Sequence, residues 1–279
     1  MSITDFSDVA ADNGATADRR TDMPRLRLPG AALLLPFAVP FGLLLAWELA
    51  SLAGLISDRV LPRPSLVLAT AWEKLLSGEL GRHLGVSALR AFAGLAVGGS
   101  VGFLLGLLNG LSRRSTVLTD TSLQMVRNIP ILALMPLVIV WFGIGEGAKL
   151  FIVSLSVFFP IYLNTLHGIR NVDAQLIEMG RAYGMSPGRL FRRIILPGAL
   201  PSIFVGLRYS LGVMWLTLIV AETLSASAGL GYMASQAREF MLLDVVVLAI
   251  LLYALLGKVA DSVTRALERR ALAWSPVYA

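Results

Sequence analysis

Long apolar runs separated by shorter polar segments dominate the chain. Six runs stand out, at about residues 31–55, 89–111, 123–142, 150–166, 203–220 and 245–263. A helix needs about 20 apolar residues to cross a bilayer core of about 30 Å, and these runs approach or exceed that length. They do not alternate apolar and polar residues as barrel strands do, and lipid offers unpaired backbone groups no partners. The pattern therefore predicts an all-α membrane protein with about six transmembrane helices.

Composition agrees with this prediction. Of the 279 residues, 56% are hydrophobic and 15% are charged, whereas a soluble domain carries about 25% charged residues. The net charge of +6 favours basic cytoplasmic loops over a nucleic-acid partner. There is no cysteine, and the two histidines, His83 and His167, lie far apart. We therefore expect no metal site and no cofactor bound by this chain.

The arginines orient the predicted helices. They gather before the first run, between the second and third, between the fourth and fifth, and after the sixth: Arg19, Arg20, Arg25 and Arg27; Arg113 and Arg114; Arg170, Arg181, Arg189, Arg192 and Arg193; Arg265, Arg269 and Arg270. Six alternating helices place all four groups on one side, which is the cytoplasmic side by the positive-inside rule. The prediction is a multi-pass protein of the cytoplasmic (inner) membrane with both termini in the cytoplasm.

The same pattern divides the chain into four parts. Residues 1–28 are polar and are predicted to form a disordered cytoplasmic tail. Residues 29–88 hold the first transmembrane helix and an extracytoplasmic interfacial segment, with a short amphipathic helix after Pro64. Residues 89–265 form the transmembrane core, and residues 266–279 form a cytoplasmic C-terminal tail.

A glycine recurs every fourth residue in the second run, at Gly94, Gly98, Gly102, Gly106 and Gly110. This spacing places all five on one helix face, where the absence of side chains lets another backbone approach closely. We expect a helix-packing face there.

The polar segment at about residues 169–201 is basic and amphipathic. Asp173 can cap a first short helix, and Gly184 suits the left-handed turn that ends it. Ser186 and Pro187 are typical of the start of a second helix, which we expect to stop at Leu196–Pro197. Two short helices without catalytic residues predict a docking element on the cytoplasmic side. The alternative is an amphipathic loop that lies on the lipid surface.

The spacing of Glu178, Gly184, Ile194, Leu196 and Pro197 in this segment resembles the EAA motif of ATP-binding cassette (ABC) importer permeases. Met179 and Gly180 stand where that family usually has alanines. Four further stretches resemble the aliphatic sulfonate, taurine and nitrate permeases, the sulfonate members most closely: residues 124–130, 159–165, 216–222 and 229–240.

The resemblance implies a type I ABC importer (MetI-like) transmembrane domain. It also implies a dimer of permeases, two cytoplasmic ATPase subunits that bind ATP and Mg²⁺, and an extracytoplasmic substrate-binding protein. Glu178, Met179, Gly180, Gly184, Ile194, Leu196 and Pro197 would then couple the permease to the ATPase. The chain lacks a phosphate-binding loop, because Gly257–Lys258 is followed by Val259. It is therefore not expected to be an enzyme.

The substrate that the resemblance favours is an aliphatic sulfonate, with nitrate, taurine or another small organic anion as alternatives. A secondary transporter or channel is the alternative of another class, and it would need coupling-ion groups or broken repeats that the sequence does not display.

Four polar residues in the apolar runs are candidates for the translocation path: Arg127, Asn164, Arg208 and Glu222. Alternatively, Arg127 and Arg208 lie near the cytoplasmic face and extend to it, and Glu222 is structural.

Overall fold

The computed structural model describes residues 31–225 and 227–274. The predicted tail at residues 1–28 and the chain end at residues 275–279 lie outside the described residues. Contacts divide the chain into residues 1–47 and residues 48–279, and each unit is described by itself. In the first unit, residues 31–47 are helical. The second unit carries the bundle and the sites described below.

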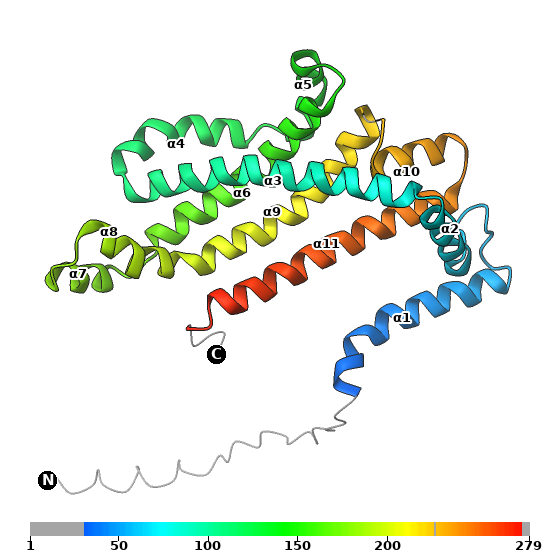
Figure 1. Ribbon diagram of the computed structural model, residues 1–279, viewed down its shortest axis with the longest axis horizontal. Coiled ribbons are helices and arrows are strands. Elements are labelled where there is room, and N and C mark those ends of the chain that lie inside the picture. The colour runs from blue at the N-terminus through cyan, green and yellow to red at the C-terminus, as the bar shows by residue number, and fades with distance from the viewer. Residues whose placement is uncertain (1–30, 226, 275–279) are drawn as a thin grey trace, which may run out of the picture. The chain divides into compact units, whose positions relative to one another are not determined.

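The described residues form helices joined by short turns, and no strand occurs among them (Figure 1). In chain order these are α1 (Ala31–Leu52), α2 (Pro64–Leu76), α3 (Glu79–Leu111), α4 (Arg113–Arg127), η1 (Ile131–Leu134), α5 (Met135–Phe142), α6 (Glu146–Arg170), α7 (Ala174–Ala182), α8 (Pro187–Leu190), η2 (Phe191–Ile195), α9 (Leu196–Ser225), α10 (Leu230–Glu239) and α11 (Leu243–Ala271).

Within these residues, four helices are long and apolar enough to cross a membrane: α3, α6, α9 together with α8 and η2, and α11. The pair formed by α4 and η1–α5 is a fifth if the two arms count as one span. The first apolar run contributes a shorter apolar helical segment, Ala38–Leu52. The all-α prediction is confirmed for the described residues, which hold four candidate spans, or five with the bent pair, in addition to this shorter segment.

The third apolar run is broken rather than continuous. Its two arms meet at an angle of 82° after Arg127. Pro130 has no amide hydrogen and disfavours helical geometry at Ile129, so the helix ends before it. The prediction of one helix over residues 123–142 was wrong, because average hydropathy does not register a proline break.

The second helix of the polar segment does not stop at Leu196–Pro197 as predicted. α8 passes through η2 into α9 without leaving the helix. The Leu196 amide donates to the Phe191 carbonyl, which is the wider spacing of a π-turn. Pro197 then lies in the first turn of α9, where a missing amide hydrogen costs little. Here proline begins a helix instead of ending one.

The face of α3 that carries Gly94, Gly98, Gly102, Gly106 and Gly110 lies against the backbone of α6. A Cβ atom on Gly102 would come within 2.6 Å of the Phe158 carbonyl oxygen, and one on Gly106 within 2.7 Å of the Tyr162 carbonyl oxygen. At Gly98 the Ser154 backbone is closer still. The two helices run in the same direction at a separation that only glycine permits.

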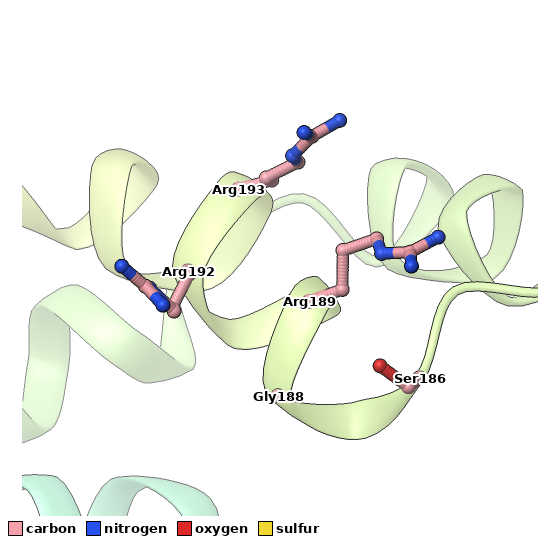
Figure 2. A pocket seen from close by; sticks show the side chains of 5 residues that line it. All are labelled: Ser186, Gly188, Arg189, Arg192 and Arg193. Carbon is pink, nitrogen blue, oxygen red and sulfur yellow. The ribbon is translucent and has the colours of Figure 1, made fainter.

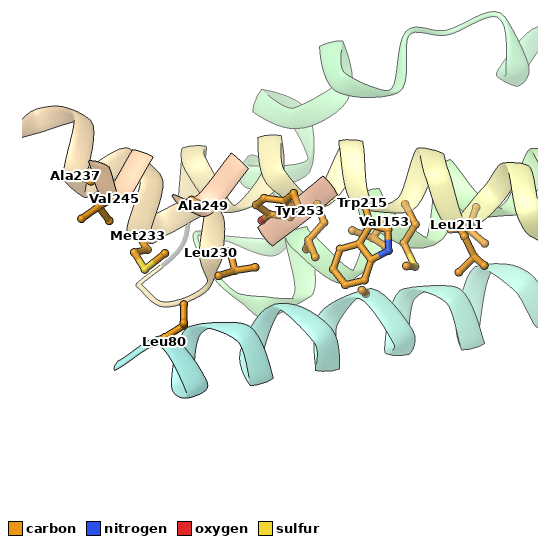
Figure 3. Close-up of a cluster of buried hydrophobic side chains, with 14 of the residues drawn as sticks. Leu80, Val153, Leu211, Trp215, Leu230, Met233, Ala237, Val245, Ala249 and Tyr253 are labelled. Carbon is orange, nitrogen blue, oxygen red and sulfur yellow. The ribbon is translucent and has the colours of Figure 1, made fainter. Parts of the chain in front are cut away.

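A hydrophobic cluster joins α3, α6, α9, α10 and α11 (Figure 3). Trp215 of α9 and Tyr253 of α11 form its aromatic centre and pack edge to face, with ring centroids 6.2 Å apart. Leu80 of α3 and Leu230 and Met233 of α10 extend the cluster to one end of the bundle. α10 is thus held on the ends of the long helices rather than beside them.

The face of α3 turned away from α6 is apolar and exposed. Leu89, Phe92, Val97, Val101, Leu104 and Leu108 are each at least 50% exposed. A continuous apolar strip of this kind is rare on a surface that faces water. It suits a helix surrounded by lipid or by another apolar helix.

The glycine face makes a test possible with two single-methyl variants of α3. Gly98→Ala should lower the free energy of unfolding by about 1–3 kcal/mol, because the new methyl group overlaps the Ser154 backbone. Gly85→Ala is the control, since nothing lies within 4 Å of its Cβ position and both variants gain the same helix propensity. Thermal unfolding of the detergent-solubilised protein would measure the difference. Equal stability of the two variants would contradict the close contact.

Candidate functional site

The predicted docking element is a compact projection made of α7, a four-residue turn, α8 and η2, which we call the knob (residues 173–195). The Asp173 carboxylate accepts a hydrogen bond from the Gln175 amide at 2.8 Å and so caps α7, as predicted. At the other end, the Gly184 amide donates to the Arg181 carbonyl at 2.9 Å and the Met185 amide to the Gly180 carbonyl at 3.0 Å. This pair of bonds is a Schellman motif, and it requires the left-handed φ of +68° found at Gly184.

A small residue at position 180 holds the two arms of the knob together. Gly180 is buried, and a Cβ atom there would lie 2.7 Å from the side chains of both Leu190 and Ile194. Met179, at the other position where the family usually has alanine, points outward and is 47% exposed. The tight contact therefore constrains position 180 and leaves position 179 free to be large.

The outer face of α7 is apolar. Leu176 and Met179 are each 47% exposed and Tyr183 is 79% exposed, at the spacing of successive turns. Glu178 is exposed beside them. Three exposed apolar side chains on a projection of this size are typical of a protein contact surface.

The other arm of the knob is basic. Ser186, Gly188, Arg189, Arg192 and Arg193 line an open hollow of about 680 Å³. Figure 2 shows Arg189 and Arg193 on one side of the helical turn and Arg192 on the other. Among the described residues, none of these three arginines forms an ion pair. Ser186 stands at the N-cap position of α8 but makes no capping hydrogen bond. The knob thus combines an apolar face with unpaired positive charge.

The remaining coupling candidates lie where the knob joins the bundle. Ile194 belongs to η2, and Leu196 and Pro197 begin α9; all three are partly buried. They connect the knob to α9 without a flexible link. A displacement of the knob would therefore act directly on the longest helical segment of the bundle.

Two candidates for the translocation path are engaged in contacts within the bundle. Arg208 of α9 pairs with two carboxylates of α11, lying 3.6 Å from Asp261 and closer to Glu268. The Asn164 amide donates to the Pro160 carbonyl at 2.8 Å, and its Cβ lies against Gly206. Arg127 is exposed at the end of α4, and no ion pair is found for it among the described residues.

Glu222 is the centre of a buried polar network at the end of the bundle opposite the knob. Its carboxylate is fully buried and accepts hydrogen bonds from Ser87 at 2.8 Å, Arg90 at 2.7 Å, the Gly231 amide at 2.9 Å and Tyr253 at 2.9 Å. These donors come from α3, α10 and α11. A buried carboxylate with so many donors joins helices together, and it leaves little capacity for a passing substrate.

The comparisons with known proteins decide the family. Residues 98–272, most of the transmembrane core, match the binding-protein-dependent transport system inner membrane components. The chain belongs to this family. The permease is 57% identical over 243 residues to the "Putative aliphatic sulfonates transport permease protein" of Escherichia coli (strain K12), covering 87% of this chain and 92% of that protein.

Further relatives and one solved structure agree with this membership. The permease is 42% identical to the protein of the same name from Bacillus subtilis (strain 168), covering 88% of each chain. It is 36% identical to the taurine transport system permease protein of Escherichia coli (strain K12), covering 83% of this chain and 86% of that one. A chain of an amino acid ABC transporter with histidines shares the fold at a TM-score of 0.56 and 18% identity, covering 72% of this permease and 97% of that chain. The predicted type I ABC importer fold is thereby confirmed.

The sequence interpretation missed part of the permease's polar network. Arg90 donates to both oxygens of Glu146 at 2.6 Å, and the buried Lys149 ammonium lies 2.9 Å from the same carboxylate. The signal was available, because Arg90 falls inside the second apolar run. Its partners Glu146 and Glu222 are more than 50 residues away in the chain, and no spacing rule connects them.

The network predicts a large effect for one conservative substitution in the permease. Glu222→Gln should lower the free energy of unfolding by about 3 kcal/mol for two reasons. Arg90 loses a buried counter-charge, and the amide NH2 group of the glutamine would face hydrogen-bond donors instead of acceptors. Tyr253→Phe removes one hydrogen bond and should cost about 1 kcal/mol. Glu239→Gln, at an exposed position of α10, is the control. Thermal unfolding in detergent would rank the three variants by stability. A Glu222→Gln variant as stable as the control would contradict the role of Glu222 in joining the helices.

Proposed function

We propose that this permease is the transmembrane subunit of an ABC importer that carries a small anion, an aliphatic sulfonate, across the cytoplasmic membrane. The observation that carries the proposal is the knob, whose Glu178, Gly184, Ile194 and Pro197 stand at the EAA spacing on a rigid projection. Family membership adds the class of transport system, since the family is that of binding-protein-dependent transport.

The knob has the properties that a docking site for a separate ATPase requires. Its apolar face at Leu176, Met179 and Tyr183 is exposed, and the internal packing at Gly180 fixes its shape. Its continuous helical junction with α9 would pass a movement of the ATPase into the membrane. The energy source is proposed to be two ATPase subunits on separate chains, which bind ATP and Mg²⁺. This permease is proposed to bind no cofactor and to catalyse no reaction itself.

The orientation follows from charge. The knob carries Arg181, Arg189, Arg192 and Arg193, and α11 ends in Arg269 and Arg270. By the positive-inside rule, we propose that the knob and both termini lie in the cytoplasm. Glu222 and α10 would lie at the extracytoplasmic end, where a binding protein delivers the substrate. A second permease copy completes the assembly.

The substrate assignment rests on similarity. Two relatives, at 57% and 42% identity, are named for the transport of aliphatic sulfonates, and one at 36% identity is named for the transport of taurine. Taurine is itself a sulfonate. Nitrate or another small organic anion is the alternative substrate. A bicarbonate transport permease is only 28% identical. A secondary transporter or channel, the alternative of another class, does not fit the family.

Reconstitution tests the whole proposal. The permease is placed in liposomes with its ATPase and its substrate-binding protein, and uptake of labelled ethanesulfonate, taurine and nitrate is followed with and without ATP. We expect ATP-dependent uptake of ethanesulfonate in preference to nitrate. Uptake that is independent of ATP or of the binding protein would refute the importer assignment, and a preference for nitrate would refute the sulfonate.

The docking role is tested with three variants of the knob. Gly184→Val forces a β-branched residue into left-handed geometry and should abolish most co-purification of the ATPase. Glu178→Gln should weaken co-purification while the permease remains folded, because the residue is exposed. Gly188→Ala is the matched control, since its Cβ position is open and its φ is ordinary. Undiminished assembly and uptake in both test variants would count against docking at the knob.

A further inference from the structure

A polar hollow of about 370 Å³ lies between α4 and α6, on the side of the bundle where the bent third span stands. Asp120, Gln124 and Arg127 of α4 line one wall, and Phe159, His167 and Arg170 of α6 line the other. The hollow is separate from the Glu222 network and from the basic surface of the knob, and neither contributes a residue to it.

The charge in this hollow is positive. Arg127 and Arg170 are exposed guanidinium groups, and among the described residues neither forms an ion pair. Arg170 donates instead to the Thr116 hydroxyl at 2.7 Å. The one carboxylate, Asp120, accepts a hydrogen bond from the Gln124 amide at 2.7 Å. Two fixed positive charges therefore face one negative charge, before any contribution from His167.

The hollow extends deep into the bundle. The contact of Arg170 with Thr116 marks its knob end. From there both helices run 11 residues onward, to Phe159 on α6 and to Arg127 on α4, a rise of about 16 Å. This is about half of a bilayer core of about 30 Å. Arg127 is thus about four turns from Arg113, too far from the knob end for its side chain to extend to the membrane surface there.

α4 is too polar on this side to face lipid. Asp120, Gln124 and Arg127 follow one another at intervals of four and three residues, so they share one face of the helix. No residue of α4 is buried. Ionisable groups at membrane depth are costly in lipid and by default face a water-filled cavity or a protein partner. Leu118, on the opposite face, is 81% exposed and suits lipid.

We propose that this hollow is the anion-binding stretch of the transport path, with Arg127 as its innermost contact for the sulfonate group. The proposal rests on the importer function above and deepens it by placing the substrate. A sulfonate carries one delocalised charge on three oxygen atoms, which a guanidinium fork can contact at two of them. Arg170 and His167 would then provide successive contacts toward the knob end, and Asp120 would keep the anion from being held too tightly.

The absence of cysteine from the native chain allows a direct test. A single Gln124→Cys variant, assembled with its ATPase in membrane vesicles, is treated with two thiol reagents of similar size. One is the anionic 2-sulfonatoethyl methanethiosulfonate, which is itself an ethanesulfonate, and the other is the cationic 2-(trimethylammonium)ethyl methanethiosulfonate. The rate of modification of the permease is followed by mass. The ratio of the two rates is normalised to that for a free thiol in solution.

We expect the anionic reagent to be favoured by about tenfold, the low end of the electrostatic enrichment in charged clefts, because Asp120 offsets part of the positive charge. Adding Arg127→Gln should remove most of this preference, whereas adding Asp120→Asn should increase it. Free ethanesulfonate should slow the reaction of Gln124→Cys. Leu118→Cys is the matched control on the same helix, and it should react slowly with both reagents. Leu123→Cys, which lines the same hollow, replaces the reporter if Gln124→Cys assembles poorly.

The outcomes separate this proposal from the importer assignment. If both reporters fail to react, or react with the same preference with and without Arg127, the hollow is not an anion path and the proposal is overturned, even where uptake succeeds. If the preference for the anionic reagent depends on Arg127 but ethanesulfonate is not taken up in liposomes, the hollow is supported as an anion site. The assignment of a sulfonate as substrate is then refuted instead. Reaction of Leu118→Cys at the rate of Gln124→Cys would also overturn the proposal, because both faces of α4 would then be in water.

Discussion

The contact on which the bundle depends is the one between α3 and α6, where a glycine every fourth residue brings two backbones together. In lipid, apolar side chains gain little by leaving their solvent, so close van der Waals contact has to supply the attraction between helices. Gly98 and Gly102 lie directly on α6 carbonyl groups. With this pair fixed, α9 packs along α6, and α10 and α11 close over the cluster around Trp215.

The two polar regions of the bundle differ in how their charges are paired. At the end formed by Glu222, α3 stays close to its neighbours, and Ser87 and Arg90 can reach a carboxylate on α9 directly. Every side-chain donor described in this network has a partner, and the result is a rigid joint. On the other side, α4 is tied to the bundle near the knob by Asn109, which bonds Thr119 and Tyr162 at 2.7 and 2.9 Å. Beyond that tie the polar hollow lies between α4 and α6, and no ion pair is found for Arg127 among the described residues.

Sequence alone predicted the features that depend on local chemistry. Asp173 as a cap, Gly184 in a left-handed turn and the glycine spacing of α3 are rules about neighbours three or four residues apart, and a single chain displays them. Prediction from the sequence failed where the same residue type can either end or begin a helix. Pro130 ends a helix and Pro197 begins one, and only the π-turn of η2 distinguishes the second case. It also missed Arg90 with Glu146, since long-range ion pairs leave no periodic signal. Arg208 was visible as a charge in an apolar run, but its partners on α11 were not.

The arrangement of rigid and open regions fits a transporter moved from one end. The knob continues into α9 through η2, and α9 carries both Arg208, paired with α11, and Glu222, joined to α3, α10 and α11. A push on the knob would therefore move α9 and its partners as one body, because separating the buried Arg90–Glu222 pair is costly and Arg208 is paired with α11 as well. α4 has no buried residue and is joined to α5 at an 82° bend. The hollow beside it is the region of the described bundle that such a movement can widen or narrow without breaking a paired charge.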